Sequence, residues 1–145
     1  MAILVIFKNA PAIAKLARTM NFKPHCKNHI NSGYIEKAIT AADYIVAALG
    51  KKDSKLLGFA CIKVRQSSVY VSTLCSSARQ GKACMQQVEA FARVMGKEEV
   101  TLEALPGVVG FYTHIGYSRT ATSSASSTSA GLVQMHKRLT QAAML

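Results

Sequence analysis

The segment from Val69 to Gly116 constrains the fold most, because its hydrophobic pattern changes period along the chain. Apolar and polar side chains alternate over 69–75, which predicts a half-buried strand. Over 81–95 the apolar residues recur every three or four positions, which predicts an amphipathic helix. A second strand over 100–104 and a second short helix over 106–116 follow. This order of elements predicts helices packed on a sheet.

The two periods also predict which side chains face the core. The strand places one alternating set on a single face, namely Val69, Val71, Thr73 and Cys75. The helix carries an apolar stripe formed by Cys84, Val88, Phe91 and Met95. Gly96 follows this stripe and suits the position where a left-handed backbone ends a helix.

Shorter apolar runs predict the remaining elements. We expect a strand over 3–7, helices over 9–20 and 32–42 joined by a loop over 21–31, and strands over 44–49 and 55–65. A tight turn at Gln66 and Ser67 connects the strand over 55–65 to the one over 68–75. The strands over 44–49, 55–65 and 68–75 would therefore form an antiparallel meander.

The end of the chain combines a polar segment with an apolar one. Residues 118–130 are rich in Ser and Thr and lack the apolar surface of a packed element, so we expect a flexible loop there. Residues 132–139 follow as a closing strand. Its alternation places Val133, Met135 and Lys137 on one face.

Length and composition indicate one domain over residues 1–145. The chain has 145 residues, of which 50% are hydrophobic, and two domains of half this size would each bury too little apolar surface. No apolar run approaches the ~20 residues that span a bilayer. No basic start precedes the run at 3–7. We therefore expect an intracellular, cytoplasmic protein.

The four cysteines, Cys26, Cys61, Cys75 and Cys84, form no C-x-x-C pair. Reduced thiols are the expected state.

The charge of the chain is strongly positive. Eighteen Lys and Arg against seven Asp and Glu give a formal net charge of +11. Such a charge favours polyanionic partners, either a nucleic acid or a phosphorylated cofactor. A basic surface that only keeps the protein soluble explains the charge equally well.

Three motifs carry a family resemblance. Residues 78–83 read Ala-Arg-Gln-Gly-Lys-Ala and resemble the turn Q/R-x-x-G-x-G/A, with Ala78 at the leading position. Residues 111–117 read Phe-Tyr-Thr-His-Ile-Gly-Tyr and resemble F-Y-x-x-x-G-F, with a final Tyr. Residues 135–139 resemble the closing strand of the same family. The chain thus resembles the GCN5-related N-acetyltransferases, although Leu-Pro-Gly over 105–107 replaces the family's asparagine.

The resemblance implies a fold and a cosubstrate. The fold would be α/β (α+β), with a mixed, mostly antiparallel central sheet flanked by helices. Acetyl-coenzyme A would lie across the strand end, where the backbone over Leu74, Cys75 and Ser76 pairs with the pantetheine arm. Its pyrophosphate would meet the amides of Arg79, Gln80, Gly81, Lys82, Ala83 and Cys84. A helix N-terminus suits a phosphate because its first amides lack partners and its dipole is positive. The side chains of Arg79 and Lys82 add charge, or are solvated loop residues.

The resemblance also implies an enzyme that transfers acetyl directly to a primary amine in a ternary complex. Tyr112 stands at the family's acid position and would protonate the departing thiolate; the alternative is a ring packed on the sheet. Glu103 lies on the strand before it, and is either a base acting through water or a solvent-facing carboxylate.

Other reactive residues are assigned lesser roles. Cys75 lies in an apolar strand without a His or Asp at activating spacing, which favours a core residue over a covalent acyl-enzyme. His114 projects ~200° from Tyr112 on a helix, so we treat it as a surface residue. His25, Cys26 and His29 lack a fourth metal ligand. We therefore expect no metal, and assign His25 and His29 to the acceptor site that this loop borders in the family.

The acceptor stays open at this stage. The positive charge disfavours polyamines and favours a small neutral or anionic amine, or a protein N-terminus. The rival hypothesis is a module that binds coenzyme A without turnover, or a nucleic acid, on the same fold. We expect a monomer or a homodimer that does not bind membranes.

Overall fold

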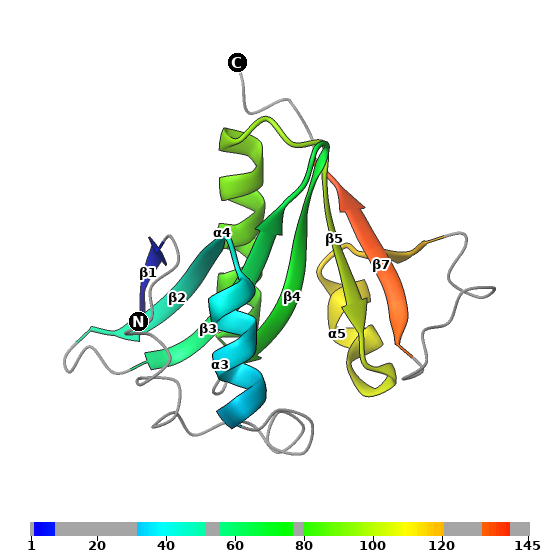
Figure 1. Ribbon diagram of the computed structural model, residues 1–145. Coiled ribbons are helices and arrows are strands. Elements are labelled where there is room, and N and C mark those ends of the chain that lie inside the picture. The colour runs from blue at the N-terminus through cyan, green and yellow to red at the C-terminus, as the bar shows by residue number, and fades with distance from the viewer. Residues whose placement is uncertain (1, 8–31, 52–55, 77–79, 121–131, 140–145) are drawn as a thin grey trace.

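The computed structural model describes residues 2–7, 32–51, 56–76, 80–120 and 132–139 (Figure 1). The predicted helix over 9–20, the loop over 21–31 and most of the Ser/Thr segment lie outside these residues. The strands are β1 (Ala2–Phe7), β2 (Tyr44–Gly50), β3 (Leu56–Val64), β4 (Ser68–Ser76), β5 (Glu99–Ala104), β6 (Ser118–Arg119) and β7 (Val133–Arg138). The helices are α3 (Ser32–Ala41), α4 (Gly81–Val94), the 3-10 turn η1 (Pro106–Val108) and α5 (Val109–His114).

The strands form one seven-stranded sheet in the order β1-β2-β3-β4-β5-β7-β6. Among the described strands, β4 and β5 alone pair in parallel, and all other neighbours are antiparallel. A parallel pair needs a crossover connection, and α4 supplies it. The predicted mixed, mostly antiparallel sheet is therefore confirmed.

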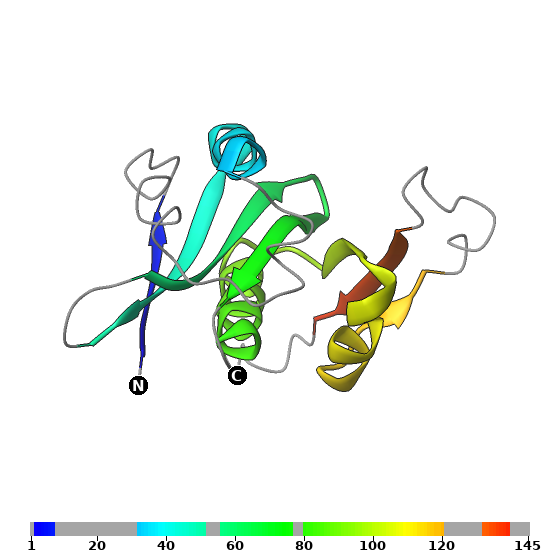
Figure 2. The ribbon, with the colours of Figure 1, turned by 90° about the horizontal axis from the view of Figure 1, so that it is seen from below.

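The helices cover both faces of the sheet. Figure 2 shows α3 on one side and α4 with α5 on the other. The core between α4 and the strands is apolar and contains Val46, Ile62, Val69, Val88 and Val100, all fully buried. Tyr112 and Tyr117 join the same cluster, so α5 shares the core of α4.

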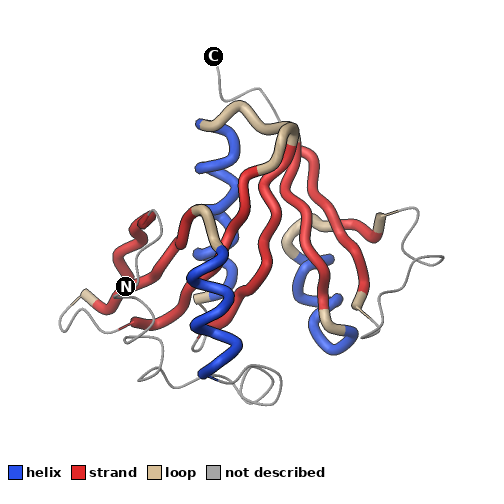
Figure 3. Tube along the Cα trace, in the orientation of Figure 1, coloured by secondary structure: helices blue, strands red, loops and turns tan. Residues whose placement is uncertain are grey.

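The parallel pairing of β4 and β5 is short. Its register starts at Ser68 with Glu99 and ends at Val71 with Leu102. Beyond this point β4 continues beside β3 to Ser76, whereas β5 continues beside β7 to Ala104. The two strands therefore diverge toward the C-terminal end of β4, which the tube in Figure 3 makes visible.

The strand periods predict the faces of β4 correctly. Val69, Val71, Thr73 and Cys75 are each buried, and the intervening Tyr70, Ser72 and Leu74 are half-buried. The turn at Gln66 and Ser67 forms as predicted, because the Arg65 amide donates to the Ser68 carbonyl at 2.8 Å.

The stripe predicted for α4 is rotated in the structure. Its buried residues are Gly81, Cys84, Met85, Val88, Glu89 and Ala92. Met95 is 39% exposed. Phe91 is half-buried and packs on Tyr44, with the two ring centroids 4.8 Å apart. The predicted stripe omitted Glu89 because it selected only apolar residues. Gly96 has a φ of +75°, which confirms it as the helix-ending glycine.

Two further predictions need correction. Ser118 and Arg119 form β6 against β7 instead of starting a loop, and the Thr120 amide donates to the Gln134 carbonyl at 2.9 Å. Edge pairing therefore outweighs the loop-like composition at this point. The helix predicted from Pro106 is divided into η1 and α5.

Gly58 tests how closely β3 supports the end of β4. A Cβ at Gly58 would lie 2.9 Å from Ser76 Cβ, whereas one at Gly107 would meet nothing within 4 Å. We expect Gly58→Ala to lower the free energy of unfolding by about 1–3 kcal/mol. Gly107→Ala, the control, should change it by less than about 0.5 kcal/mol. Urea unfolding of both variants is the measurement, and equal midpoints would contradict the close contact.

Candidate functional site

Ser76, Gly81 and Phe111 lie close together, at the end of β4 and the start of α4. A Cβ at the buried Gly81 would lie 3.2 Å from Phe111 Cζ and 3.3 Å from Ser76 Oγ. The absence of a side chain at Gly81 therefore lets the start of α4 approach both α5 and the end of β4. A larger residue at this position would press against Phe111 and Ser76.

The first turn of α4 offers backbone donors at this place. The Cys84 amide makes the first helical bond to the Gln80 carbonyl at 3.0 Å, so the preceding amides of Gly81, Lys82 and Ala83 lie before that ladder. The half-buried Gln80 gives no side-chain cap, and Lys82 is exposed. Arg79, the other basic residue assigned to this turn, lies outside the described residues. An anion suits such an N-terminus.

The turn that ends α5 fixes Tyr112 and Tyr117 against each other. The Tyr117 amide donates to the Tyr112 carbonyl at 2.9 Å, and the Gly116 amide donates to the Thr113 carbonyl at 3.1 Å. This pair of bonds is a Schellman motif, in which a glycine with positive φ reverses the chain. Gly116 has a φ of +104°. The two Tyr rings then meet edge-on, with centroids 5.8 Å apart.

Tyr112 is a buried phenol. It is 7% exposed and contacts Phe111 as well as Tyr117, and its hydroxyl forms no hydrogen bond with the described residues. Burial raises the pKa of Tyr112 well above its usual range, because the anion would lose its hydration. The phenol therefore stays protonated at neutral and mildly alkaline pH.

Glu103 lies on the opposite face of β5 from the core. Leu102 and Ala104 are buried among the core residues, whereas Glu103 is half-buried and accepts a hydrogen bond from the Tyr70 hydroxyl at 2.9 Å. The Arg65 guanidinium lies 4.3 Å from the Tyr70 ring centroid. Tyr112 packs with the core face of β5. The two predicted catalytic residues therefore flank one strand from opposite sides, where β4 and β5 diverge.

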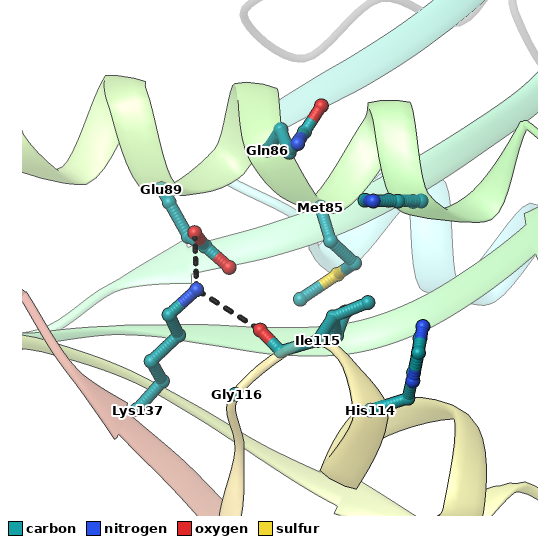
Figure 4. A pocket seen from close by; sticks show the side chains of 8 residues that line it. Met85, Gln86, Glu89, His114, Ile115, Gly116 and Lys137 are labelled. Atoms are coloured by element: carbon teal, nitrogen blue, oxygen red, sulfur yellow. Dashed lines mark hydrogen bonds and ion pairs between the residues drawn. The ribbon is translucent and has the colours of Figure 1, made fainter.

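A hollow of about 340 Å³ separates α4 from the end of α5 (Figure 4). Its lining contains Lys82, Met85, Gln86, Glu89, His114, Ile115, Gly116 and Lys137. His114 is exposed, as predicted, but it also lines this hollow. Within it, Lys137 Nζ donates to Glu89 Oε1 at 3.0 Å.

Sequence reasoning missed this ion pair, although its signals are present. Lys137 was predicted on the face of Met135, which is 1% exposed. Glu89 follows Val88 on the buried side of α4. Two opposite charges on the core sides of two elements predict an ion pair, since a buried charge needs a partner of opposite charge.

The cysteines have different states. Cys75 is disulfide-bonded, and its partner lies outside the described residues, so the prediction of reduced thiols is wrong for this residue. The search for close C-x-x-C pairs could not detect a partner brought near by the fold. Cys61 and Cys84 are free and buried, and burial raises the pKa of each thiol to about 12.

The predicted acceptor residues His25 and His29 lie outside the described residues, together with Cys26. Within the described ranges, no group of three His, Cys, Asp or Glu could hold a metal ion. No helix in this same part of the chain is long and apolar enough to cross a membrane.

The buried phenols predict a loss of stability in alkali. The folded protein keeps the Tyr112 proton at a pH where the unfolded chain has released it, above ~10, so the free energy of unfolding falls as pH rises. Each such group contributes a slope of at most about 1.4 kcal/mol per pH unit. Tyr112→Phe should flatten this slope in urea unfolding between pH 9 and 11, because the buried thiols are common to both proteins. An unchanged slope would contradict the raised pKa.

Comparisons with known proteins agree with this architecture. No protein-family model and no curated protein sequence matches the chain. The crystal structure of Tetrahymena GCN5 is 15% identical, with a TM-score of 0.75 over 96% of this chain and 97% of that chain. The catalytic domain of Tetrahymena GCN5 histone acetyltransferase in complex with coenzyme A is 15% identical, with a TM-score of 0.73 over 98% and 95%. The Thermoplasma acidophilum PaiA N-acetyltransferase in complex with coenzyme A is 14% identical, with a TM-score of 0.62 over 94% and 99%.

These identities are low, so the likeness concerns the fold. The chain therefore has the fold of the GCN5-related N-acetyltransferases, as its motifs predict.

Proposed function

We propose that the protein is an acetyl-coenzyme A-dependent N-acetyltransferase that transfers acetyl directly to a primary amine in a ternary complex. The observation that carries this proposal is the divergence of β4 and β5 after Val71 and Leu102. Beyond that point β4 runs on to Ser76, which lies close to the helix N-terminus at Gly81. An elongated cosubstrate with an anionic middle part fits between two such strands and against such an N-terminus.

The donor site uses backbone more than side chains. The amides of Gly81, Lys82 and Ala83 would hold the pyrophosphate, together with Gln80 and the charge of Lys82. The Cys84 amide, which the resemblance also assigned to the phosphate, is already bonded to the Gln80 carbonyl. The backbone of Leu74, Cys75 and Ser76 would accompany the pantetheine arm. The absence of a Cβ at Gly81 supports this assignment, because it lets the start of α4 lie close to Ser76, the last residue of β4.

Two residues would handle protons during transfer. A primary alkylamine with a pKa near ~10 is mostly protonated at pH 7, so a base must remove its proton. Glu103 would do this through water on its side of β5. On the core side, the protonated Tyr112 phenol would donate to the thiolate as it departs. The raised pKa makes the phenol a weaker acid, which favours a rate contribution near the lower end of the usual ~10²–10⁴.

The acceptor would be a small neutral or anionic amine or a protein N-terminus. The net charge of +11 disfavours an approaching polyamine. Glu103, already bonded to Tyr70, is a single carboxylate and would suit one amine. A panel of such amines, assayed for release of free coenzyme A, identifies the acceptor.

The rival function is binding without turnover. The same fold could retain coenzyme A, or the basic surface could bind a nucleic acid with a steep dependence on salt. Absence of coenzyme A release across the panel, with intact acetyl-coenzyme A binding, would favour the first of these.

Calorimetry tests the donor site. We expect acetyl-coenzyme A to bind at one equivalent per chain, and Gly81→Glu to abolish binding, because an anionic side chain would enter the phosphate position. Gly110→Glu is the matched control, since it adds the same charge on α5 where a Cβ meets nothing within 4 Å.

Melting temperatures establish that both variants fold. If Gly81→Glu disrupts the contact with Phe111 and unfolds the protein, Gly81→Ala replaces it in the binding measurement. Wild-type affinity in a folded Gly81→Glu variant would remove the phosphate assignment. Saturable binding of a random oligonucleotide, without binding of the coenzyme, would favour the nucleic-acid function.

Tyr112→Phe tests the acid. The variant keeps the ring packing and loses one hydroxyl, so the affinity for acetyl-coenzyme A should survive while the single-turnover rate falls by about 10². In the wild type, the rate should not decline as the pH approaches the usual pKa of a tyrosine, since burial raises the pKa of Tyr112. Stopped-flow single-turnover measurements from pH 7 to 10 provide the data. Equal rates in both proteins would exclude the acid role, and a collapsed melting temperature would indicate a packing role.

A further inference from the structure

A polar network joins α4, the turn that ends α5, and β7. Two of its residues, Glu89 and Lys137, line the hollow (Figure 4). The Tyr117 hydroxyl donates to Glu89 Oε2 at 2.9 Å, and Lys137 Nζ donates to Glu89 Oε1 at 3.0 Å. Lys137 Nζ also donates to the Ile115 carbonyl at 3.0 Å. We call Glu89, Tyr117 and Lys137 the Glu89 network.

The network is buried and its carboxylate is fully paired. Glu89 and Lys137 side chains are 7% and 29% exposed, and Tyr117 is 2% exposed. Each Glu89 oxygen accepts one hydrogen bond, so the charge does not remain unsatisfied. A buried ion pair adds little stability over well-packed apolar residues, because desolvation offsets the attraction. The value of such a pair lies in the arrangement that it specifies.

The arrangement that it specifies is the place of α5. The Tyr117 ring packs edge-on against the Tyr112 ring, so the bond from Tyr117 to Glu89 links Tyr112 to α4. The bond from Lys137 to Ile115 satisfies a carbonyl at the C-terminal end of α5, where a cation is favoured.

Gly116 lets the Lys137 side chain reach this carbonyl. A Cβ at Gly116 would lie 3.1 Å from Lys137 Cε and 3.3 Å from its Nζ. The glycine is therefore needed twice, for the positive φ of the turn and for the space that Lys137 occupies. The bonds from Tyr117 to Glu89 and from Lys137 to Ile115 therefore both hold the C-terminal end of α5, the short helix that carries Tyr112.

We propose that Glu89, Tyr117 and Lys137 are positioning residues that set the place of the Tyr112 hydroxyl relative to α4. This inference rests on the proposed acid role of Tyr112. Among the described residues, none of the hydrogen bonds of the network involves the Gly81 turn or Glu103. We therefore expect its loss to affect the proton donor and to spare the coenzyme site. An error of about 1 Å in the position of a reacting group costs up to about 10² in rate.

The test uses variants that keep the volume of the network. Tyr117→Phe removes only the hydroxyl, and Glu89→Gln with Lys137→Met removes both charges together. The double variant avoids an unpaired buried charge, so its melting temperature should stay close to that of the wild type. Lys137→Met alone leaves Glu89 with one donor and should lower the melting temperature. Thr113→Val is the control, because it removes an exposed hydroxyl bond to Val109 on the same helix.

Fluorine NMR reports the place of Tyr112 without any acceptor. The chain has five tyrosines, so 3-fluorotyrosine labelling gives five resonances, and Tyr112→Phe assigns the one of interest. We expect this resonance to shift or broaden in Tyr117→Phe and in the double variant, and to stay unchanged in Thr113→Val. The single-turnover rate should fall about tenfold in the first two, with coenzyme A affinity within about threefold of wild type.

The outcomes separate this inference from the proposed function. An unchanged Tyr112 resonance in both network variants would overturn the positioning role. Recovery of the wild-type rate in the stable double variant would overturn it as well, since the network would then serve stability alone. Failure of the wild-type chain to bind coenzyme A would instead refute the donor site, and the NMR comparison would still decide whether the network places Tyr112.

Discussion

The architecture depends on the short parallel pairing of β4 with β5. Four residue pairs, from Ser68 with Glu99 to Val71 with Leu102, join two antiparallel halves of the sheet. One half contains β1 to β4, and the other contains β5, β7 and β6. Each half is held by its own ladders, so the strands can diverge after the last pair without losing support. The site occupies the place that this divergence opens.

The two halves meet again on the helical side. Gly81 at the start of α4 contacts Phe111 of α5, and the Glu89 network joins α4 to Tyr117 and β7. The two halves of the sheet are therefore joined in two ways. Backbone hydrogen bonds between β4 and β5 join them at one end, and side-chain contacts between α4, α5 and β7 join them on the helical side. Side-chain contacts tolerate small shifts that a ladder does not, so the distance between α4 and α5 depends on them. This is the distance that would place an acid on α5 relative to a cosubstrate on α4.

The periodic spacing of apolar residues predicted those elements that depend on neighbouring residues in the sequence. The faces of β4, the turn at Gln66 and the end of α4 at Gly96 follow from alternation, loop length and a left-handed backbone. What depends on distant partners was missed. The Ser118 segment has loop composition but gains a ladder with β7, and the Cys75 disulfide involves a residue that no spacing rule identifies.

The site shows the same division between local and distant information. The resemblance predicted Tyr112 as the acid, with a ring packed on the sheet as the alternative; the ring is buried, and the acid role stays a prediction. Strand alternation predicts Glu103 on the face opposite Leu102 and Ala104, and the structure has it there. The Glu89 network was not predicted, since an ion pair between α4 and β7 needs the crossing of the two elements, and a purely apolar stripe excludes Glu89 by construction.

The pattern F-Y-x-x-x-G-F acquires a physical meaning from these contacts. Its first residue packs on Gly81, its second enters the core, and its glycine reverses the chain so that the last ring returns to the second. Any aromatic residue at the last position could make that ring contact. This chain departs from the pattern with Tyr117, and its hydroxyl is the donor to Glu89. A phenylalanine there would leave one oxygen of a buried carboxylate without a donor, which is costly. The departure and the acidic residue on α4 are therefore physically coupled, and each accounts for the presence of the other.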